Sequence, residues 1–298
     1  MFNLAISPAQ IDIVIKPGSS LTQAYQITNN SDQTLFLTTS VEPWLPTDTT
    51  GSLTYENATS NPNLGFSLSN TDIALGQNFK LSSGESRQLV LKIKSDPSTP
   101  LADSYYTFFI SQSPISTLNQ QNSITQAKIG SHILISASGT ESPKISSSIS
   151  RFFITPRFKD SFFSNINFNA QVDNSSDHYF LTQGQLNISK DDQTIKTFDL
   201  FPHHVLAKHS RQIACTLYFD QQKLPPQAVP CALKAPLWPG KYTATITLSE
   251  TSQSISFYVF PYSLFFTILF FVGIFIAFKK LKPNRSSKHK KTSYRTEA

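Results

Sequence analysis

Three histidines stand close together in the stretch FPHHVLAKHS, at His203, His204 and His209. Imidazole is the commonest metal ligand in proteins, so this cluster raises the question of a metal site. A metal site needs ligands that converge on one point with carboxylate support, whereas adjacent residues of a strand point to opposite faces. We therefore interpret these histidines as solvated loop residues, with His178 elsewhere, and predict no metal and no cofactor.

Cys215 and Cys231 are the only cysteines in the sequence. In an oxidising compartment they could form a disulfide that closes the intervening LPPQAVP stretch, worth about 3 kcal/mol by the chain-entropy estimate. The alternative is a pair of small, buried apolar side chains. Without further Cys or His at metal-ligand spacing, the two do not make a zinc site.

No motif of a known catalytic centre is present. The sequence has no G-x-S-x-G elbow, no H-E-x-x-H, no phosphate loop and no Gly-rich dinucleotide turn. The carboxylate pair Asp191–Asp192 lies in SKDDQT, which is typical of a turn. We predict that the protein is not an enzyme.

Aromatic residues in a long polar stretch, Glu42–Phe66, are candidates for ligand contact. Trp44, Tyr55 and Phe66 could stack on sugars there, because long loops are often functional. Trp44 could instead close the end of a hydrophobic core. Tyr55 stands between polar residues in the middle of the stretch, so we expect its loss to weaken binding without unfolding the domain.

The elements that must position these residues are β-strands. IDIVI places Ile11, Ile13 and Ile15 on one face, and LFLTTSV, QLVLKIK and HILIS continue the alternation. Turn clusters such as KPGS and NNSD separate the runs, and no helical period of comparable length precedes residue 259. Short strands at this spacing indicate antiparallel sandwiches.

An internal repeat divides these strands into two groups. QITNNSD at 26–32 recurs as QVDNSSD at 171–177, and each copy is followed by a later strand that opens with a tyrosine, Tyr105 or Tyr242. Such a tyrosine is typical of immunoglobulin-like folds. We predict an all-β protein with two tandem immunoglobulin-like antiparallel β-sandwiches, at 1–140 and 141–258.

A transmembrane helix is predicted at 259–279, followed by a basic tail at 280–298. Positions 262–278 carry no charge, and positions 279–298 hold eight basic residues against one acidic residue. Such a cluster stays on the cytoplasmic side, so we expect a single-pass membrane protein with extracellular N-terminal domains. The rest of the chain has 17 basic and 18 acidic residues, which disfavours nucleic-acid binding. MFNLAISPAQ lacks the features of a signal peptide. Either the precursor is longer, which we favour, or the N-terminal part is cytoplasmic and the basic tail lies outside.

Several stretches resemble WxL-interacting cell-surface proteins of Gram-positive bacteria. ISPAQIDIVIKPGSSLTQAYQITNNSDQTLFL and FKLSSGESRQLVLKIKSDPSTPLADSYYTFFIS are similar to the peptidoglycan-binding domain of that family. VDNSSDHYFLTQGQLNISKDDQTI and LWPGKYTATITL resemble its second immunoglobulin-like domain. The resemblance implies a membrane-anchored scaffold whose first domain contacts peptidoglycan or another cell-wall glycan and whose other partners are surface proteins.

A chaperone-like assembly factor for surface structures is the alternative, because the first domain is also similar to the N-terminal domain of pilus chaperones. Such proteins clamp a partner strand to a sheet edge and anchor its carboxylate with basic residues. The first domain has no Arg before Arg87, which counts against a carboxylate clamp within that domain.

Overall fold

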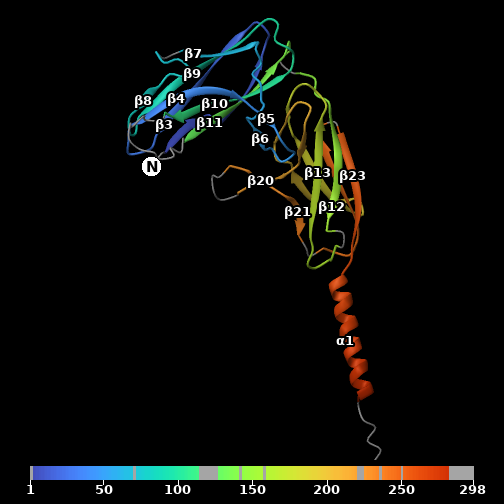
Figure 1. The fold of residues 1–298 in the computed structure, drawn as a ribbon. Coiled ribbons are helices and arrows are strands. Elements are labelled where there is room, and N and C mark those ends of the chain that lie inside the picture. Colours follow the sequence, from blue (N-terminus) through green and yellow to red (C-terminus); the bar gives the residue numbers. More distant parts are fainter. Residues whose placement is uncertain are drawn as a thin grey trace, which may run out of the picture.

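The computed structural model describes residues 3–69, 72–113, 127–140, 143–156, 159–219, 225–234, 237–249 and 251–281. Two β-sandwiches follow one another along the chain, and a single helix leaves the far end of the second sandwich (Figure 1). The predicted fold class is confirmed. The basic tail at 282–298 lies outside the described residues.

Two sheets make up the first sandwich. One contains, in spatial order, β1 (Leu4–Ser7), β3 (Ser20–Asn29), β9 (Ser86–Ser95) and β7 (Leu64–Leu68). The other contains β2 (Gln10–Ile15), β11 (Lys128–Ala137), β10 (Asp103–Gln112), β4 (Leu35–Pro43) and β8 (Phe79–Leu81). Strand β2 pairs parallel to β11, and the other described pairs of this sandwich are antiparallel.

The core of the first sandwich follows from the alternation in its strands. In β9, Leu89, Leu91 and Ile93 are fully buried, whereas Lys92 and Lys94 are exposed. One face of each strand is therefore removed from water and the other is solvated, which is the pattern expected of an antiparallel sandwich.

The long polar stretch of the first sandwich is folded rather than open. It contains the hairpin of β5 (Leu45–Pro46) and β6 (Leu53–Thr54), which extends toward the second sandwich (Figure 1). Trp44, just before β5, is 6% exposed, and its indole Nε1 donates to the carbonyl of Tyr106 at 2.9 Å. The hairpin is thus attached to the outer face of the sheet that contains β10.

The second sandwich has a similar plan. One sheet holds β12 (Ser147–Thr155), β13 (Asn165–Asn174) and β18 (Ser210–Gln212), with β21 (Cys231–Lys234) also paired to β13. The facing sheet holds β16 (Gln193–Asp199), β15 (Gly184–Lys190), β22 (Gly240–Leu248) and β23 (Thr251–Val259). Short pairs join β14 (Phe180–Leu181) to β17 (His204–Val205) and β19 (Cys215–Leu217) to β20 (Gln227–Val229).

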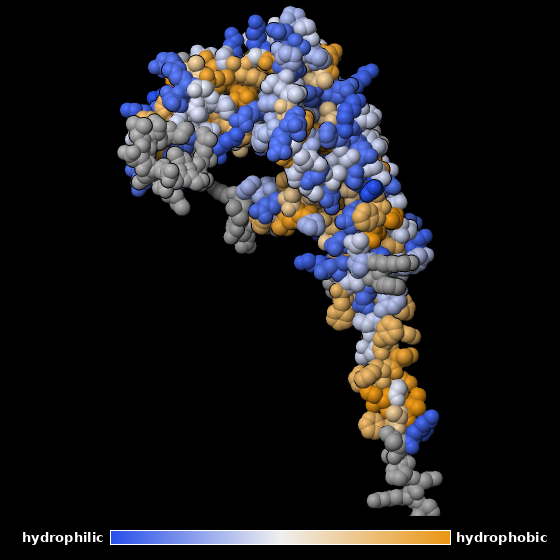
Figure 2. Space-filling view, in the orientation of Figure 1, coloured by the Kyte–Doolittle hydropathy of each residue, from blue (hydrophilic) through white to orange (hydrophobic). Residues whose placement is uncertain are grey.

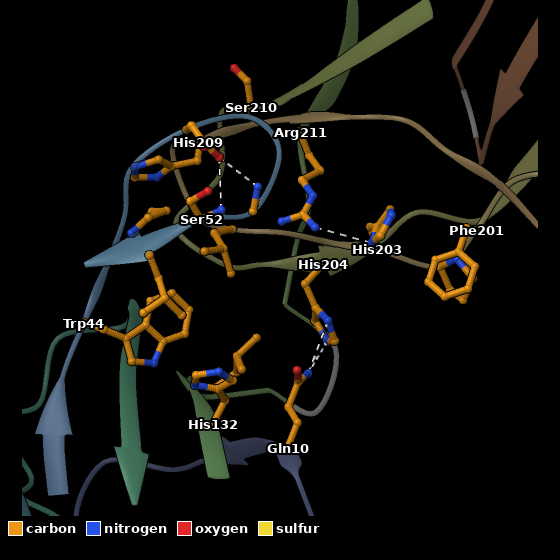
Figure 3. Close-up of a pocket in the computed structure, with 17 residues that line it drawn as sticks. Gln10, Trp44, Ser52, His132, Phe201, His203, His204, His209, Ser210 and Arg211 are labelled. Carbon is orange, nitrogen blue, oxygen red and sulfur yellow. Dashed lines mark hydrogen bonds between the residues drawn. The ribbon is translucent and has the colours of Figure 1, made fainter. Parts of the chain in front are cut away.

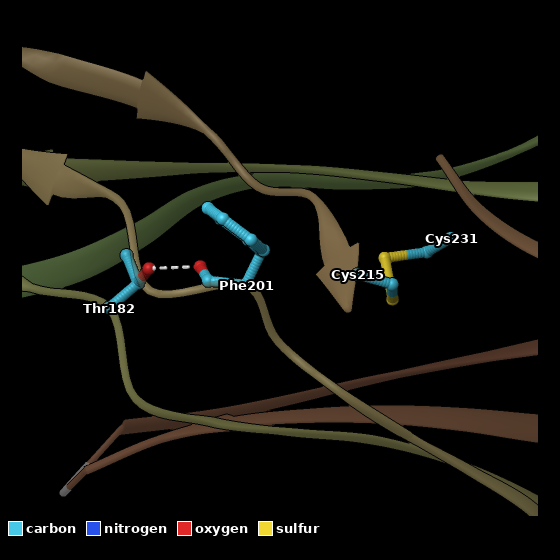
Figure 4. Close-up of a disulfide and its surroundings, with 4 residues drawn as sticks. All are labelled: Thr182, Phe201, Cys215 and Cys231. Atoms are coloured by element: carbon cyan, nitrogen blue, oxygen red, sulfur yellow. Dashed lines mark hydrogen bonds between the residues drawn. A yellow bond between two sulfur atoms is a disulfide. The ribbon is translucent and has the colours of Figure 1, made fainter. Parts of the chain in front are cut away.

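A disulfide joins Cys215 of β19 to Cys231 of β21 in the core of the second sandwich (Figure 4). Both cysteines are nearly fully buried. On the chain between β14 and β15, the Thr182 hydroxyl donates to the carbonyl of Phe201 at 2.8 Å. The segment that leads from Phe201 into β19 is therefore held at both ends.

The internal repeat corresponds to one buried asparagine in each sandwich. Asn29 is 0% exposed and Asn174 is 3% exposed. The Asn29 amide nitrogen lies 2.8–3.0 Å from the carbonyls of Gln33, Leu81 and Ser82. The Asn174 amide nitrogen likewise lies 2.8–3.1 Å from the carbonyls of His178, Val205 and Leu206. The side-chain oxygens of Asn29 and Asn174 accept from the serines two positions later, Ser31 and Ser176.

The helix α1 (Tyr262–Leu281) is long and apolar enough to cross a membrane, and none of its most apolar window is buried in the protein. Only Phe260 and Pro261 separate it from β23. The carbonyl of Pro261 accepts from Phe265 N at 3.0 Å, so Pro261 is the residue that precedes the first helical position.

Candidate functional site

The two sandwiches meet through the buried carboxylate of Asp103, at the start of β10. This side chain is 1% exposed and accepts from the backbone N–H of Tyr179 at 2.5 Å. His178 Nδ1 lies 3.1 Å from the same carboxylate and 2.7 Å from the Ser136 hydroxyl. Burial raises the pKa of Asp103, and the hydrogen bonds from Tyr179, Ser136, Tyr105 and His178 oppose that shift.

Tyr105 forms the second contact between the sandwiches. Its hydroxyl donates to Asp103 at 3.0 Å and accepts from the N–H of Ala207 in the second sandwich at 2.9 Å. Burial and the adjacent charge of Asp103 raise the pKa of Tyr105. Tyr105 also stacks on Trp44, with 5.0 Å between the ring centroids. The interface is thus made of polar groups that are each hydrogen-bonded.

The β5–β6 hairpin is the third contact. The Thr49 carbonyl accepts from Gln212 N at 2.8 Å. Gly51, with φ of +103°, lies directly against Arg211, and a Cβ added there would come within 2.0 Å of a guanidinium nitrogen. Asp48 accepts from the N–H groups of Thr50, Gly51 and Ser52. Hydrogen bonds from the Ser52 side chain and backbone, followed by those from Thr50, lower the pKa of Asp48. A glycine is therefore needed where the hairpin meets Arg211.

A cavity of about 400 Å³ lies between the sandwiches. Trp44, His132 and Gln10 of the first sandwich face His203, His204 and Arg211 of the second across it (Figure 3). The remaining lining residues are Pro46, Asp48, Gly51, Ser52, Leu53, Leu134, Phe201, Pro202, Leu206, His209 and Ser210. The volume is that of a small-molecule or peptide-terminus site.

The lining carries hydrogen-bond donors in a partly desolvated setting. Burial lowers the pKa of His132. Burial, and then the charges of Arg211 and His204, lower the pKa of His203. Burial also lowers the pKa of Arg211, against the opposing charge of Asp48. No carboxylate among the described residues forms an ion pair within 4 Å of Arg211, whose nearest hydrogen-bond partner is His203 Nδ1 at 3.4 Å. A guanidinium without such a pair is suited to an anionic ligand group.

Among the described residues, part of one edge of the first sandwich near this cavity has no paired strand. Strand β2 pairs with β11 only from His132 onward. Within the described part of the chain, no strand pairs with the same side of Lys128–Ser131, the beginning of β11. Because antiparallel pairing to β10 uses alternate residues, the backbone groups of Lys128 and Gly130 face this open edge.

The predicted ligand-contacting aromatics do not form one platform. Trp44 lines the cavity. Tyr55 is half-buried, its hydroxyl lies 3.0 Å from Thr107 Oγ1 and its ring packs on Phe109. Phe66 packs against Tyr106 at the edge of the core. Tyr55 was expected to be removable without cost to the fold, but its packing on the sheet means that its loss would remove structural contacts.

The histidines were interpreted as solvated, and that interpretation holds for His209, which is exposed. It is wrong for the other three, because His203 and His204 are half-buried in the cavity wall and His178 is 12% exposed beside Asp103. Among the described residues, no group of three or more His, Cys, Asp or Glu side chains is placed to hold a metal ion.

Sequence reasoning missed Asp103, Ala207 and Arg211. Their contacts run between segments that are distant in sequence, so no local period marks them. The only signal was the composition of the stretch FPHHVLAKHSRQ, which is unusually rich in imidazole and basic groups for a strand connection.

The sequence matches no protein-family model and no curated protein sequence. Among solved structures, the chain is similar to the class 5 fimbriae chaperone CfaA, with a TM-score of 0.40 and 14% identity over 86% of this chain and 99% of that one. The E. coli chaperone DraB gives 0.38 and 12%, over 86% and 98%. The SafB chaperone in complex with the Salmonella enterica SafA pilin gives 0.37 and 9%, over 87% and 97%. These values are too low to carry an argument about function.

Proposed function

We propose that the protein is a non-enzymatic, membrane-anchored binding protein that holds a polypeptide partner between its two sandwiches. The observation that carries this proposal is the juxtaposition of two features. Among the described residues, Arg211 has no carboxylate partner in the cavity, and the cavity is lined by His132, which directly follows Lys128–Ser131, the part of β11 with no described strand on its outer side. The proposal corresponds to the chaperone-like alternative rather than to attachment to the wall.

The cavity fits a carboxylate at the end of a chain. Arg211 offers a planar set of donors. On the opposite wall, His204 Nε2 lies 2.6 Å from a carboxylate oxygen of Asp12, and Gln10 Nε2 donates to the same carboxylate at 3.0 Å, so this pair shapes the wall and leaves Arg211 as the donor for a ligand. The absence of an Arg from the early part of the first sandwich argued against a carboxylate clamp. In the structure the arginine comes from the second sandwich, so the clamp would be shared between the two.

The open edge of β11 fits the residues that precede such a carboxylate. An extended segment paired along Lys128–Ser131 would lie in line with β2, which pairs parallel to β11 from Gln10 onward. Its final residue would then lie next to Ala9, whose carbonyl accepts from His132 N at 3.0 Å, beside the cavity wall formed by Gln10 and His132. Backbone pairing would supply affinity, and the cavity would select a free carboxyl terminus.

We further propose that α1 crosses the membrane and that both sandwiches lie on the outer side. The eight basic residues at 279–298 support this orientation. Protease added to intact cells stripped of their wall should remove the sandwiches and leave a small membrane-bound fragment. Full protection of residues 1–250 would reverse the orientation.

Binding to peptidoglycan stays a prediction from the resemblance to WxL-interacting proteins. Because Trp44, Tyr55 and Phe66 face different surroundings, they supply no sugar-stacking surface that would favour it. Sedimentation of the full-length protein with purified peptidoglycan tests this reading independently of peptide binding.

Peptide binding can be tested with full-length protein in nanodiscs and a library of displayed twelve-residue peptides. One half of the library ends in a free carboxylate and the other half in a carboxamide. We expect selection of free-acid peptides with alternating apolar residues. Arg211→Gln should abolish the preference for the free acid, whereas the control Arg151→Gln, on the outer face of β12, should retain it.

Equal binding of acids and amides to the unmodified protein would exclude the carboxylate clamp. Retention of peptidoglycan in the pellet together with no peptide binding would favour the wall-attachment reading instead.

A further inference from the structure

Large aromatic side chains gather where the second sandwich meets α1. Phe163 is 80% exposed, Trp238 82% and Tyr258 70%, and Phe162 and Phe260 are 46% and 44% exposed. We call these five residues the juxtahelical cluster. The other strongly exposed aromatic side chains among the described residues outside α1 are Phe36, Phe153 and Tyr218, which are scattered. In Figure 2 the helix is mostly orange, and the end of the domain next to it shows orange and blue side chains together.

A single carboxylate fastens part of this cluster to the helix. Asp160 accepts from the N–H groups of Phe162 at 2.8 Å and Phe163 at 3.2 Å. The same carboxylate accepts from the N–H of Ser263, the second helical residue, at 2.6 Å and from its hydroxyl at 3.0 Å. The turn that carries the two phenylalanines is therefore fixed relative to the beginning of α1.

The remaining members of the cluster are held at the same level. Ser161 N donates to the carbonyl of Phe260 at 3.1 Å, and Leu237 N donates to the carbonyl of Ser161 at 2.7 Å. This second bond places Trp238 next to the turn. The Phe260 ring packs on Tyr262 of the helix, with 5.0 Å between centroids. Three separate segments thus present aromatic rings around one helix end.

The length of α1 fixes where this end lies in a bilayer. Its uncharged part, 262–278, spans about 26 Å, and all 20 residues, with Lys279 and Lys280 in the last turn, span about 30 Å, the thickness of the hydrocarbon core. The helix has no length to spare, so its first residue must lie near the core boundary. Val259, three positions before Tyr262, is then at most about 10 Å above that boundary, within or just above the headgroup layer.

We propose that the juxtahelical cluster binds the lipid bilayer, with its rings in the headgroup layer of the leaflet where α1 begins. Aromatic side chains are enriched at this depth because one end of the ring system is apolar and the other tolerates water. This inference rests on the membrane crossing of α1 proposed above, and continuity with that helix selects lipid over a protein partner as the occupant.

Charge at this end of the domain supports attachment that does not depend on anionic lipid. Lys190 donates to the carbonyl of Pro239, and Lys241 pairs with Tyr258 in the β22–β23 register. Lys159, beside Asp160, and Lys234, paired with Asn165 at the start of β13, lie at this end as well. Four described lysines thus face three described carboxylates, those of Asp160, Asp191 and Asp192, and the charge nearly cancels. The binding should therefore be mainly apolar and should tolerate salt.

Trp238 provides a direct test in the full-length protein. The protein is placed in phosphatidylcholine nanodiscs whose acyl chains are brominated at a shallow position, and its fluorescence is compared with that in unbrominated discs. Subtracting the signal of Trp238→Phe removes the contribution of the buried Trp44. We expect the Trp238 fluorescence to be quenched by bromine, shielded from aqueous iodide, and unaffected by 0.5 M salt.

Two further variants separate lipid contact from mere attachment by the helix. Phe162→Ser with Phe163→Ser should reduce the quenching of Trp238 while the protein still floats with the discs. Phe153→Ser, on the exposed side of β12, should leave the quenching unchanged. Fluorescence that is quenched by iodide but not by brominated lipid would overturn the proposal and leave the cluster as a surface for a protein partner.

Discussion

The two sandwiches share a buried asparagine with matching hydrogen bonds, and they differ in the hydrogen-bond partner of a tyrosine in a later strand. Asn29 and Asn174 make matching hydrogen bonds to three backbone carbonyls and to a serine two positions later. The tyrosines differ: Tyr242 donates to the carbonyl of Trp238 at 2.6 Å within its own domain, whereas Tyr105 bonds across to Ala207. The shared asparagine maintains the fold in both copies, and the divergent tyrosine serves the contact between them.

The largest loss of stability should come from replacing the buried asparagine of either sandwich. Asn29→Ala or Asn174→Ala leaves several buried carbonyls without a donor, and we expect each to cost its own sandwich roughly 3–4 kcal/mol of unfolding free energy. Denaturant unfolding monitored by hydrogen exchange can assign the loss to one sandwich. The exposed neighbour Asn30→Ala should change little. Unequal losses for the two asparagines would show that the matching contacts are not energetically equivalent.

The disulfide distinguishes the second sandwich from the first. Replacing Cys215 and Cys231 by serine should lower the unfolding free energy of the second sandwich by about 3 kcal/mol and leave the first unchanged, because the bond closes a short loop within one domain. Reductant should reproduce the loss in the unmodified protein and have no effect on the double variant. An effect on both sandwiches would mean that they unfold as one unit.

Substituting the two tyrosines should distinguish a hydrogen bond within one sandwich from a hydrogen bond between the sandwiches. Tyr242→Phe removes one bond and should cost the second sandwich about 1 kcal/mol, seen as faster exchange in β22 and β23. Tyr105→Phe leaves the Ala207 N–H unpaired, so exchange should accelerate at Ala207. If Tyr105→Phe instead destabilised only its own sandwich, the tyrosine would not be an interdomain residue.

Lowering the pH should reduce stability by a smaller amount, through the two histidines of the cavity wall. His132 and His203 have folded-state pKa values below the ordinary 6.5, so the unfolded chain binds protons more readily. The stability they contribute is complete above about pH 6.5 and is lost as the pH falls through their lowered pKa values. His132→Gln should flatten the decline in thermal midpoint between pH 7 and 5. The exposed His209→Gln is the control, and identical slopes for the His132 variant and the unmodified protein would refute this assignment.

The strands could be predicted because their alternation is local. Ile13 and Ile15 in β2, and Leu89 to Ile93 in β9, are buried on the face that the period indicates. The repeat around Asn29 and Asn174 was also visible, although only as a turn signal. Its role as a clamp depends on carbonyls of Leu81 and Val205, which lie far along the chain.

The candidate site was not predictable in the same way. Asp103, Tyr105 and Arg211 become a site only when one sandwich is placed against the other, and no periodicity encodes that placement. The loop aromatics were visible as residue types, but their surroundings decide their role. Trp44 and Tyr55 are used mainly to attach the β5–β6 hairpin to its sheet.

The direct connection between β23 and α1 has a mechanical consequence. With α1 in the membrane and a partner bound as proposed above, a force on the partner would act on the second sandwich through β12, while the helix would hold it through the end of β23. These two strands would then be pulled in opposite directions along their own lengths. Each is paired along nearly its full length, β12 to β13 and β23 to β22, so the ladder bonds would be strained together rather than one after another. Shear of this kind resists rupture better than unzipping, so the strand arrangement is compatible with the proposed binding of a partner under tension.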